Sequence, residues 1–281
     1  MDTRQTVSDL RYALSDTEVG AYHRDGIIGP FTLMSPEEME EERFIIDREI
    51  VAPAGNDDDP DMHFHDRHLD HESVCRICRR PELVERVSSL LGPDVLIWRS
   101  NFQVKKPAAV AVGDAKKYTR VPWHQDGAYY DLQPHVLVSA WIAITESTEE
   151  NGCLKVVAGS HLQTFDHDID PGKYEFERSI PDDAIDHNSV RAFVMRPGEF
   201  VLFNENTVHS SGPNHTSQPR IGLTPRISVP FVRVTGNPRY AGGDWADRAR
   251  DAPDELRKVA MLRGHDYTGR QRVVPLPCGE S

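Results

Sequence analysis

A histidine and an aspartate two residues apart constrain this chain more than any other feature of its sequence. They are His124 and Asp126, in the stretch VPWHQDG at residues 121–127. Side chains at i and i+2 of an extended segment point to the same face, so His124 and Asp126 converge on one point while Gln125 faces away. The stretch therefore predicts a strand that carries two metal ligands and needs a third from elsewhere in the chain.

The candidate for the third ligand is His209, in the segment NTVHSSG at residues 206–212, directly after the apolar run Phe200–Phe203. Two histidines and one carboxylate on one face of an iron ion form the facial triad of non-heme Fe(II) oxygenases, which leaves the other face open. The same ligands can also hold the zinc ion of a hydrolase. His124, Asp126 and His209 are thus the predicted metal ligands and catalytic residues, with iron favoured over zinc.

A second histidine-rich region competes for this role. The segment HFHDRHLDH, residues 63–71, holds four histidines in nine residues, as metal-binding tracts do. No carboxylate elsewhere is tied to it by pattern. We therefore favour a loop that is solvated or lines the pocket over a catalytic metal site. Tyr129 and Tyr130 are further candidates for the pocket wall.

Arginine is suited to bind the far carboxylate of a 2-oxoacid that chelates such a metal, because its planar fork matches a carboxylate. Arg220 lies eleven residues after His209 on the next predicted strand. A turn at residues 212–214 could bring that strand back beside the metal. Arg220 is therefore the predicted binding residue for 2-oxoglutarate.

Composition bounds the protein class. A chain of 281 residues with 38% hydrophobic residues can bury the core of one large domain. The net charge of −13 argues against binding to nucleic acid or anionic membranes. No apolar run is long enough to span a membrane, and the first residues lack a signal-peptide pattern. We expect a cytoplasmic protein that acts on a small molecule, with a second copy or a carrier protein left open as a partner.

The four cysteines are interpreted as reduced thiols, in keeping with the cytoplasm. Cys75 and Cys78 are separated by two residues, but no second pair completes a zinc site. Cys153 and Cys278 stand alone.

The order of the predicted elements indicates a mostly β fold with flanking helices. Ser15 and Ser35 begin helices, and Pro81 begins another within a helical N-terminal part at about 15–92. Short strands with turns between them follow over about 94–235 and predict a sandwich or barrel such as a jelly roll. A C-terminal helix is expected at about 244–262. The polar segment 160–190 interrupts the strands and is interpreted as a lid over the site.

These motifs together resemble the phytanoyl-CoA dioxygenase family of Fe(II)- and 2-oxoglutarate-dependent dioxygenases. The resemblance covers roughly residues 16–235. It rests on His124-Gln125-Asp126, His209 and Arg220, and on Pro134, Trp141, Asn151-Gly152-Cys153-Leu154, Gly159-Ser160-His161 and Pro197-Gly198-Glu199.

The resemblance implies a double-stranded β-helix with Fe(II), 2-oxoglutarate and O2 at its centre. It implies that Arg220 binds the co-substrate and that Lys106, before Pro107, lies near it, although the adjacent Lys105 leaves this alignment open by one residue. Gln125 and Trp141 match positions that line the pocket, while Trp141 could equally be a core residue.

The implied reaction is hydroxylation of an unactivated C–H bond, with release of succinate and CO2. Halogenases that resemble this chain have a small residue in place of the carboxylate, so Asp126 favours hydroxylation over chlorination. Desaturation, cyclisation and a non-catalytic metal-binding jelly roll remain alternatives. Four arginines could favour a small anionic or carrier-tethered substrate: Arg99, Arg120, Arg226 and Arg233.

Overall fold

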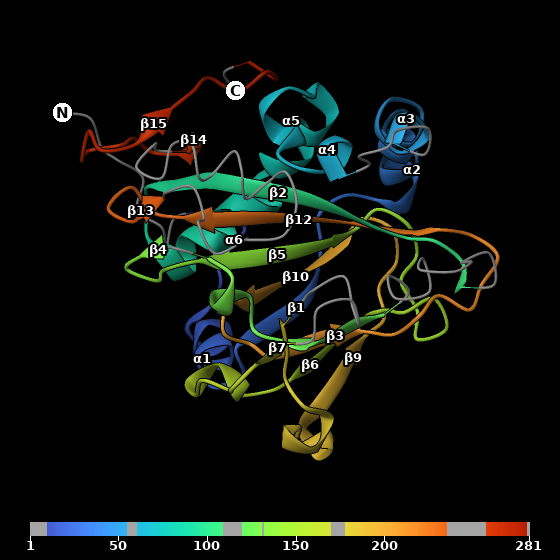
Figure 1. Cartoon of the computed structure of the whole chain (residues 1–281). Helices are drawn as coiled ribbons and strands as arrows, with labels where there is room; N and C mark the ends of the chain where they lie inside the picture. Colours follow the sequence, from blue (N-terminus) through green and yellow to red (C-terminus); the bar gives the residue numbers. More distant parts are fainter. Residues whose placement is uncertain are drawn as a thin grey trace.

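Two β-sheets form the centre of the protein, and most of the helices pack on the outer side of the larger sheet (Figure 1). The expected jelly-roll architecture is confirmed. The computed structural model describes residues 10–54, 61–108, 120–130, 132–169, 178–234 and 257–279.

The larger sheet has the strand order β1-β10-β5-β12-β2-β14-β15 within the described residues. Its pairs are antiparallel except for β14 with β15. The strands expected near residues 95, 137, 200 and 220 all lie in this sheet. Their bounds are β1 (Ile27–Thr32), β2 (Val95–Lys105), β5 (Val138–Ala143), β10 (Glu199–Asn204), β12 (Arg220–Ser228), β14 (Lys258–Arg263) and β15 (Arg272–Val273).

The smaller sheet has the order β3-β11-β6-β9 and carries the predicted metal ligands. Two further strand pairs, β4 with β13 and β7 with β8, lie outside both sheets. The bounds are β3 (Val121–His124), β4 (Leu132–Gln133), β6 (Leu154–Val157), β7 (Asp168–Ile169), β8 (Arg178–Ser179), β9 (Val190–Phe193), β11 (His209–Ser211) and β13 (Arg233–Val234).

The N-terminal helices begin where the sequence predicts. Ser15 and Ser35 each accept a hydrogen bond from the third backbone N–H of the helix that follows, and the glutamates at those positions bond back to the serine N–H groups. Pro81 begins α6. The helical elements are α1 (Asp16–Asp25), α2 (Pro36–Ile46), the π-helical turn η2 (Asp47–Val51), α3 (Ala52–Ala54), α4 (Asp61–Phe64), η3 (Arg67–Leu69), α5 (Glu72–Cys78) and α6 (Pro81–Leu91).

The period-two alternation of β5 shows how the sheet separates core from site. Val138, Ala140 and Ile142 face the helices and join the main hydrophobic core. Trp141 faces the opposite way and lines the pocket between the sheets. Polar side chains can therefore gather on the inner face without disturbing the helix-covered core.

The expectation of a C-terminal helix is wrong where the structure describes it. Lys258–Arg263 forms strand β14, which pairs with the edge of β2 through Ala260 and Ile97. Backbone groups at the edge of β2 need partners, and this pairing supplies them. The remainder of the predicted helix, residues 244–256, lies outside the described residues.

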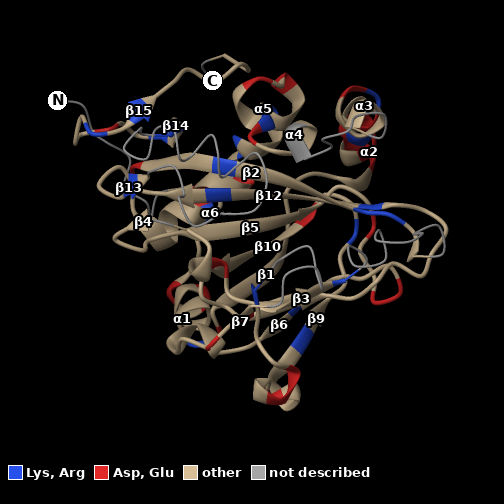
Figure 2. Cartoon of the chain, in the orientation of Figure 1, with Lys and Arg blue, Asp and Glu red and all other residues tan. Residues whose placement is uncertain are grey.

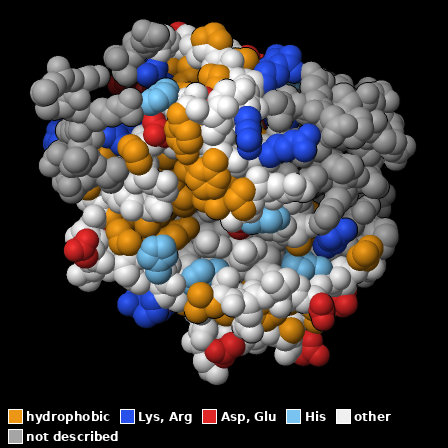
Figure 3. Space-filling view, turned by 90° about the vertical axis from the view of Figure 1, so that its left-hand side faces the viewer, with side chains coloured by type: hydrophobic (Ala, Val, Ile, Leu, Met, Phe, Trp, Pro, Cys, Tyr) orange, Lys and Arg blue, Asp and Glu red, His pale blue; other side chains and the backbone are white. Residues whose placement is uncertain are grey.

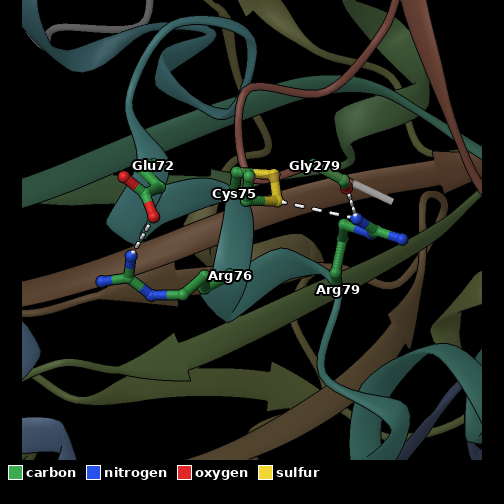
Figure 4. Close-up of a disulfide and its surroundings, with 6 residues drawn as sticks. Glu72, Cys75, Arg76, Arg79 and Gly279 are labelled. Carbon is green, nitrogen blue, oxygen red and sulfur yellow. Dashed lines mark hydrogen bonds and ion pairs between the residues drawn. A yellow bond between two sulfur atoms is a disulfide. The ribbon is translucent and has the colours of Figure 1, made fainter. Parts of the chain in front are cut away.

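The expectation that all cysteines are reduced is also wrong. Cys75 of α5 forms a disulfide with Cys278, and the two α-carbons are 5.8 Å apart (Figure 4). Arg79 donates to the backbone carbonyl of Gly279 beside this bond. Sequence spacing favoured no such pair because 203 residues separate the two cysteines. Cys78 and Cys153 are buried thiols, and burial raises the pKa of Cys78 to about 12.

None of the helices in the described ranges combines the length and the apolar character that crossing a membrane requires.

Candidate metal centre

The antiparallel pairing of β3 with β11 places His209 directly opposite His124. Asp126 follows two residues after His124, where the chain leaves β3 and enters the turn η6 (Asp126–Ala128). The backbone of Gln125 is extended, so His124 and Asp126 converge as predicted. The ligand atoms of the three residues all lie within 4.8 Å of one another.

Both imidazoles are oriented by backbone carbonyls. The Nδ1 of His124 lies 2.9 Å from the carbonyl oxygen of Pro122, and that of His209 lies 2.9 Å from the carbonyl oxygen of Thr207. Nδ1–H donates in each case, which leaves the lone pair of Nε2 for a metal. The two Nε2 atoms lie 3.7 and 3.9 Å from Oδ1 of Asp126. Two imidazole nitrogens and one carboxylate oxygen therefore face a shared point.

The pKa shifts of His209 and Asp126 favour the protonation states that a metal needs. Burial lowers the pKa of His209 to about 4, so its imidazole is neutral at physiological pH. Burial would raise the pKa of Asp126, but Arg226, His124 and His209 together outweigh it and hold that pKa well below its usual range. Neutral His209 and ionised Asp126 therefore fit a divalent metal such as Fe(II).

Arg220, the first residue of β12, lies buried in the same pocket. Its Nη1 donates to the carbonyl oxygen of Gly152 at 3.1 Å, and its guanidinium stacks 5.0 Å from the ring of Trp141. Among the described residues its Nε has no hydrogen-bond partner. Burial lowers the pKa of Arg220 to about 10, so the side chain stays charged at neutral pH. A buried cation with an unused donor is what a carboxylate ligand requires.

The two neighbouring lysines differ in burial and in neighbours. Lys105 is buried and pairs with Arg220 across β2 and β12, whereas Lys106 is exposed. The side chain of Lys105 approaches Gly152, as does that of Arg220. Of the two lysines, Lys105 is therefore the one that lies beside Arg220 and Gly152.

Of the two residues expected to line the pocket, Trp141 does so and Gln125 does not. Trp141 lines the pocket, and Gly222 on β12 makes room for it, because a Cβ at position 222 would lie 2.4 Å from the indole. Gln125 is turned away: its Nε2 donates to the carbonyl oxygens of Gln163 and Asn206, and its Oε1 accepts from the N–H of Phe165. Gln125 therefore fixes loops behind the metal strand and does not line the pocket.

The segment 160–190, interpreted as a lid, packs against β3 where the structure describes it. The N–H of Ile180 donates to the carbonyl oxygen of Trp123, and Trp123 Nε1 donates to Asp182. The helical turns of the segment 160–190 are η7 (Ser160–Leu162), η8 (Asp182–Ala184) and η9 (His187–Ser189). Trp123 faces away from the metal, so these contacts support the back of the metal-bearing strand. Residues 170–177 lie outside the described residues.

The pocket also contains residues that the sequence did not single out. Gln103 on β2 and Thr224 on β12 face the same space, and the Thr224 hydroxyl donates to Gln103 Oε1 at 2.7 Å. The sequence signal was the polar alternation Asn101, Gln103, Lys105 within a strand. Among the described residues the pocket is lined by Gln103, Val121, His124, Asp126, Trp141, Leu154, Phe203, His209, Ser210, Ser211, Arg220, Thr224 and Arg226, around an empty space of about 540 Å³ that extends into open solvent.

The predicted arginines divide into two pairs. Arg226 and Arg99 are buried and adjacent on β12 and β2, whereas Arg120 and Arg233 are exposed. Figure 2 shows basic residues at neighbouring places on these two strands.

The histidine-rich segment lies apart from the metal ligands. His68 is fully buried and bonds Ser100 on β2, and His71 bonds Glu49. Neither residue lines the pocket. Figure 3 shows further histidines at separate places beside hydrophobic side chains on one face of the molecule.

Comparison with known proteins agrees with this geometry. The mouse peroxisomal phytanoyl-CoA dioxygenase is 33% identical over 166 residues, covering 57% of this chain and 46% of the mouse protein. The ectoine dioxygenase of Streptomyces anulatus is 25% identical over 224 residues, covering 72% of this chain and 74% of that protein. The chain spans about half the length of the first curated relatives that it matches.

Among solved structures, CytC3 with Fe(II) and alpha-ketoglutarate superposes with a TM-score of 0.66 at 26% identity, covering 94% of this chain and 93% of that one. The sequence profile described as Phytanoyl-CoA dioxygenase (PhyH) matches residues 22–222, well over half of the chain. The chain therefore belongs to the phytanoyl-CoA dioxygenase family.

Proposed function

We propose that this protein is an Fe(II)- and 2-oxoglutarate-dependent dioxygenase that hydroxylates an unactivated C–H bond of a small anionic metabolite. The observation that carries the proposal is that one pocket contains both the candidate metal ligands and the candidate binding residue for 2-oxoglutarate. His124, Asp126 and His209 converge on one side of it, and buried Arg220 lies on the other. The family membership and the iron- and alpha-ketoglutarate-bound CytC3 neighbour support it.

Metal binding and co-substrate binding are assigned to residues on opposite sides of the pocket. His124, Asp126 and His209 would hold Fe(II), and Arg220 would bind the distal carboxylate of 2-oxoglutarate. The bound iron and co-substrate supply the oxidation of the C–H bond, with release of succinate and CO2. Trp141, with the apolar side chains Leu154 and Phe203, excludes water from the space between the sheets.

The anionic substrate is supported by the arginines on the inner face of the larger sheet. Arg226 lines the pocket and Arg99 lies beside it, both buried. Arg226 donates to Asp126, and the guanidinium of Arg99 beside it would add the positive charge that attracts a carboxylate or phosphonate group. The curated hypophosphite and ectoine dioxygenases act, by their names, on small molecules.

Anaerobic titration of the metal-free protein with Fe(II) and 2-oxoglutarate, followed by visible absorption, tests the proposal. A weak metal-to-ligand charge-transfer band is expected, because the 2-oxoacid would chelate iron through two oxygens. Candidate anions can then be screened by how they perturb the band. Bound iron without a band, together with no succinate formed in air, would refute the dioxygenase function.

Chlorination is the alternative that Asp126 argues against, because the carboxylate occupies the position that a halide would need. We expect Asp126→Ala to lose hydroxylation. Wild-type hydroxylation by this variant would show that the ligand assignment is incorrect.

A further inference from the structure

We propose that Arg226 is a positioning residue that holds Asp126 as a one-oxygen metal ligand and so preserves the coordination positions that the co-substrate needs. The inference rests on the proposed function and deepens it. It comes from the two oxygens of Asp126, which have different surroundings. Oδ1 faces the imidazole nitrogens of His124 and His209 at 3.7 and 3.9 Å, whereas Oδ2 accepts a hydrogen bond from Arg226 Nη2 at 3.2 Å.

The contact is buried on both sides. The side chain of Arg226 is 7% exposed and that of Asp126 is 6% exposed. A charged hydrogen bond in such a dry environment is much stronger than one in water. Rotation of the carboxylate to present both oxygens to a metal would break this bond and leave the Arg226 nitrogen without its acceptor. The guanidinium therefore opposes bidentate coordination.

Arg226 is itself held in place by the larger sheet. Its Nη1 donates to Oδ1 of Asn101 at 2.9 Å, and Arg99 Nε donates to the same oxygen at 3.1 Å. The ring of Tyr130 lies 5.1 Å from the guanidinium carbon. These contacts fix the plane of the guanidinium as well as its position. The two Nη atoms of Arg226 bond different acceptors, which the single ammonium of a lysine cannot reproduce in the same geometry.

The arrangement has a consequence for co-substrate binding. With one ligand atom from each of His124, Asp126 and His209, a bound Fe(II) would keep open positions for 2-oxoglutarate and O2. A second oxygen from Asp126 would occupy one of them. The cation at Oδ2 therefore favours the 2-oxoacid in competition with the protein's own carboxylate.

The test measures two affinities on Arg226→Met and Arg226→Lys. Mn(II) binding to the metal-free protein is followed by electron paramagnetic resonance, and 2-oxoglutarate binding to the anaerobic Fe(II) protein by its charge-transfer band. In Arg226→Met we expect Mn(II) to bind severalfold more tightly and 2-oxoglutarate at least tenfold more weakly. A collapsed site would weaken both, so the opposite signs distinguish positioning from general damage.

Arg226→Lys separates geometry from charge. It retains the cation, so a purely electrostatic role predicts wild-type values for both affinities. Positioning by the planar guanidinium predicts that Arg226→Lys binds Mn(II) more tightly, and 2-oxoglutarate about threefold more weakly, than the wild type. Asn101→Leu removes the acceptor that holds Arg226 Nη1. It should also tighten Mn(II) binding and weaken 2-oxoglutarate binding, by a smaller amount than Arg226→Met.

The matched control is Arg191→Met, because Arg191 pairs with Asp25 at 3.1 Å on the exposed surface. It should leave both affinities unchanged, and thermal unfolding of every variant checks the fold. Wild-type behaviour of Arg226→Lys, or unchanged 2-oxoglutarate affinity in Arg226→Met, would overturn the proposal. If the wild type gives no charge-transfer band, the proposed function fails. The role of Arg226 is then decided by the Mn(II) affinity of Arg226→Lys alone. Tighter binding than in the wild type supports positioning, and equal binding overturns it.

Discussion

Histidines serve two different purposes in this molecule, and the comparison shows what makes a metal site. The segment 63–71 holds four histidines within nine residues, whereas the metal centre takes His124 and His209 from distant parts of the chain. His68 is fully buried and its Nδ1 lies 2.8 Å from the Ser100 hydroxyl. It braces the segment against the outer face of β2 and has no role in a converging ligand set.

The difference lies in backbone geometry and not in composition. Strand pairing sets His209 opposite His124, and the extended backbone at Gln125 brings Asp126 to the same side. In segment 63–71 the chain passes through short helical turns, and His68 and His71 bond different partners, Ser100 and Glu49. Local density of ligating residues is therefore a weaker guide than strand register.

The largest effect that sharpens this comparison is removal of a metal ligand. We expect His209→Ala to weaken Fe(II) or Mn(II) binding by on the order of 1000-fold, because only two of three ligands remain. Anaerobic calorimetric titration measures it. The control is His71→Ala in the histidine-rich segment, which should bind metal as the wild type does. The reverse pattern would move the metal site to segment 63–71.

The next largest effect concerns the co-substrate. Arg220→Ala should raise the 2-oxoglutarate dissociation constant by about 100-fold, which is about 2.7 kcal/mol, the size of a charged hydrogen-bonded pair. The Fe(II) dissociation constant should change by less than about threefold. Titration of the charge-transfer band measures the former, and competition with a metal indicator measures the latter. Equal changes in both would count against the assigned role of Arg220.

A stability effect without a metal effect should follow in the histidine-rich segment. His68→Ala removes a buried hydrogen bond and leaves a cavity, so we expect the free energy of unfolding to fall by about 2 kcal/mol. Denaturant titration at pH 7 measures the loss, and Mn(II) affinity should be unchanged. Reduced metal affinity with intact stability would make this segment part of the site.

The smallest expected effect is a pH dependence. Burial lowers the pKa of His68 to about 4, below its ordinary value of 6.5. The unfolded chain therefore takes up the proton first, and the stability contributed by neutral His68 is present above pH 6.5 and lost as the pH falls toward 4. Between pH 7 and 5.5 the free energy of unfolding of the wild type should fall by about 1 kcal/mol more than that of His68→Asn. Denaturant titration of the metal-free proteins measures the difference. Parallel losses would show that His68 does not stay neutral.

Much of the site could be read from the sequence because its signals are local. The spacing of His124 and Asp126 within an extended stretch predicted two ligands on one face, and Arg220 stood on the strand that follows His209. Helix starts at Ser15 and Ser35 were equally local, since a capping box involves residues only three apart. The mostly β fold followed from alternating strands and turns.

Interactions between distant segments were decided only by the tertiary structure. Residues 258–263 are a strand because the edge of β2 offers hydrogen bonds, and Cys278 meets Cys75 because that strand brings the C-terminal segment back to α5. The position of Lys105 beside Arg220 depends on the pairing of β2 with β12, and the bond from Arg226 to Asp126 links β12 to the turn that follows β3. A sequence fixes which face a side chain takes along its own strand, but which strand lies opposite is set by packing of the whole chain.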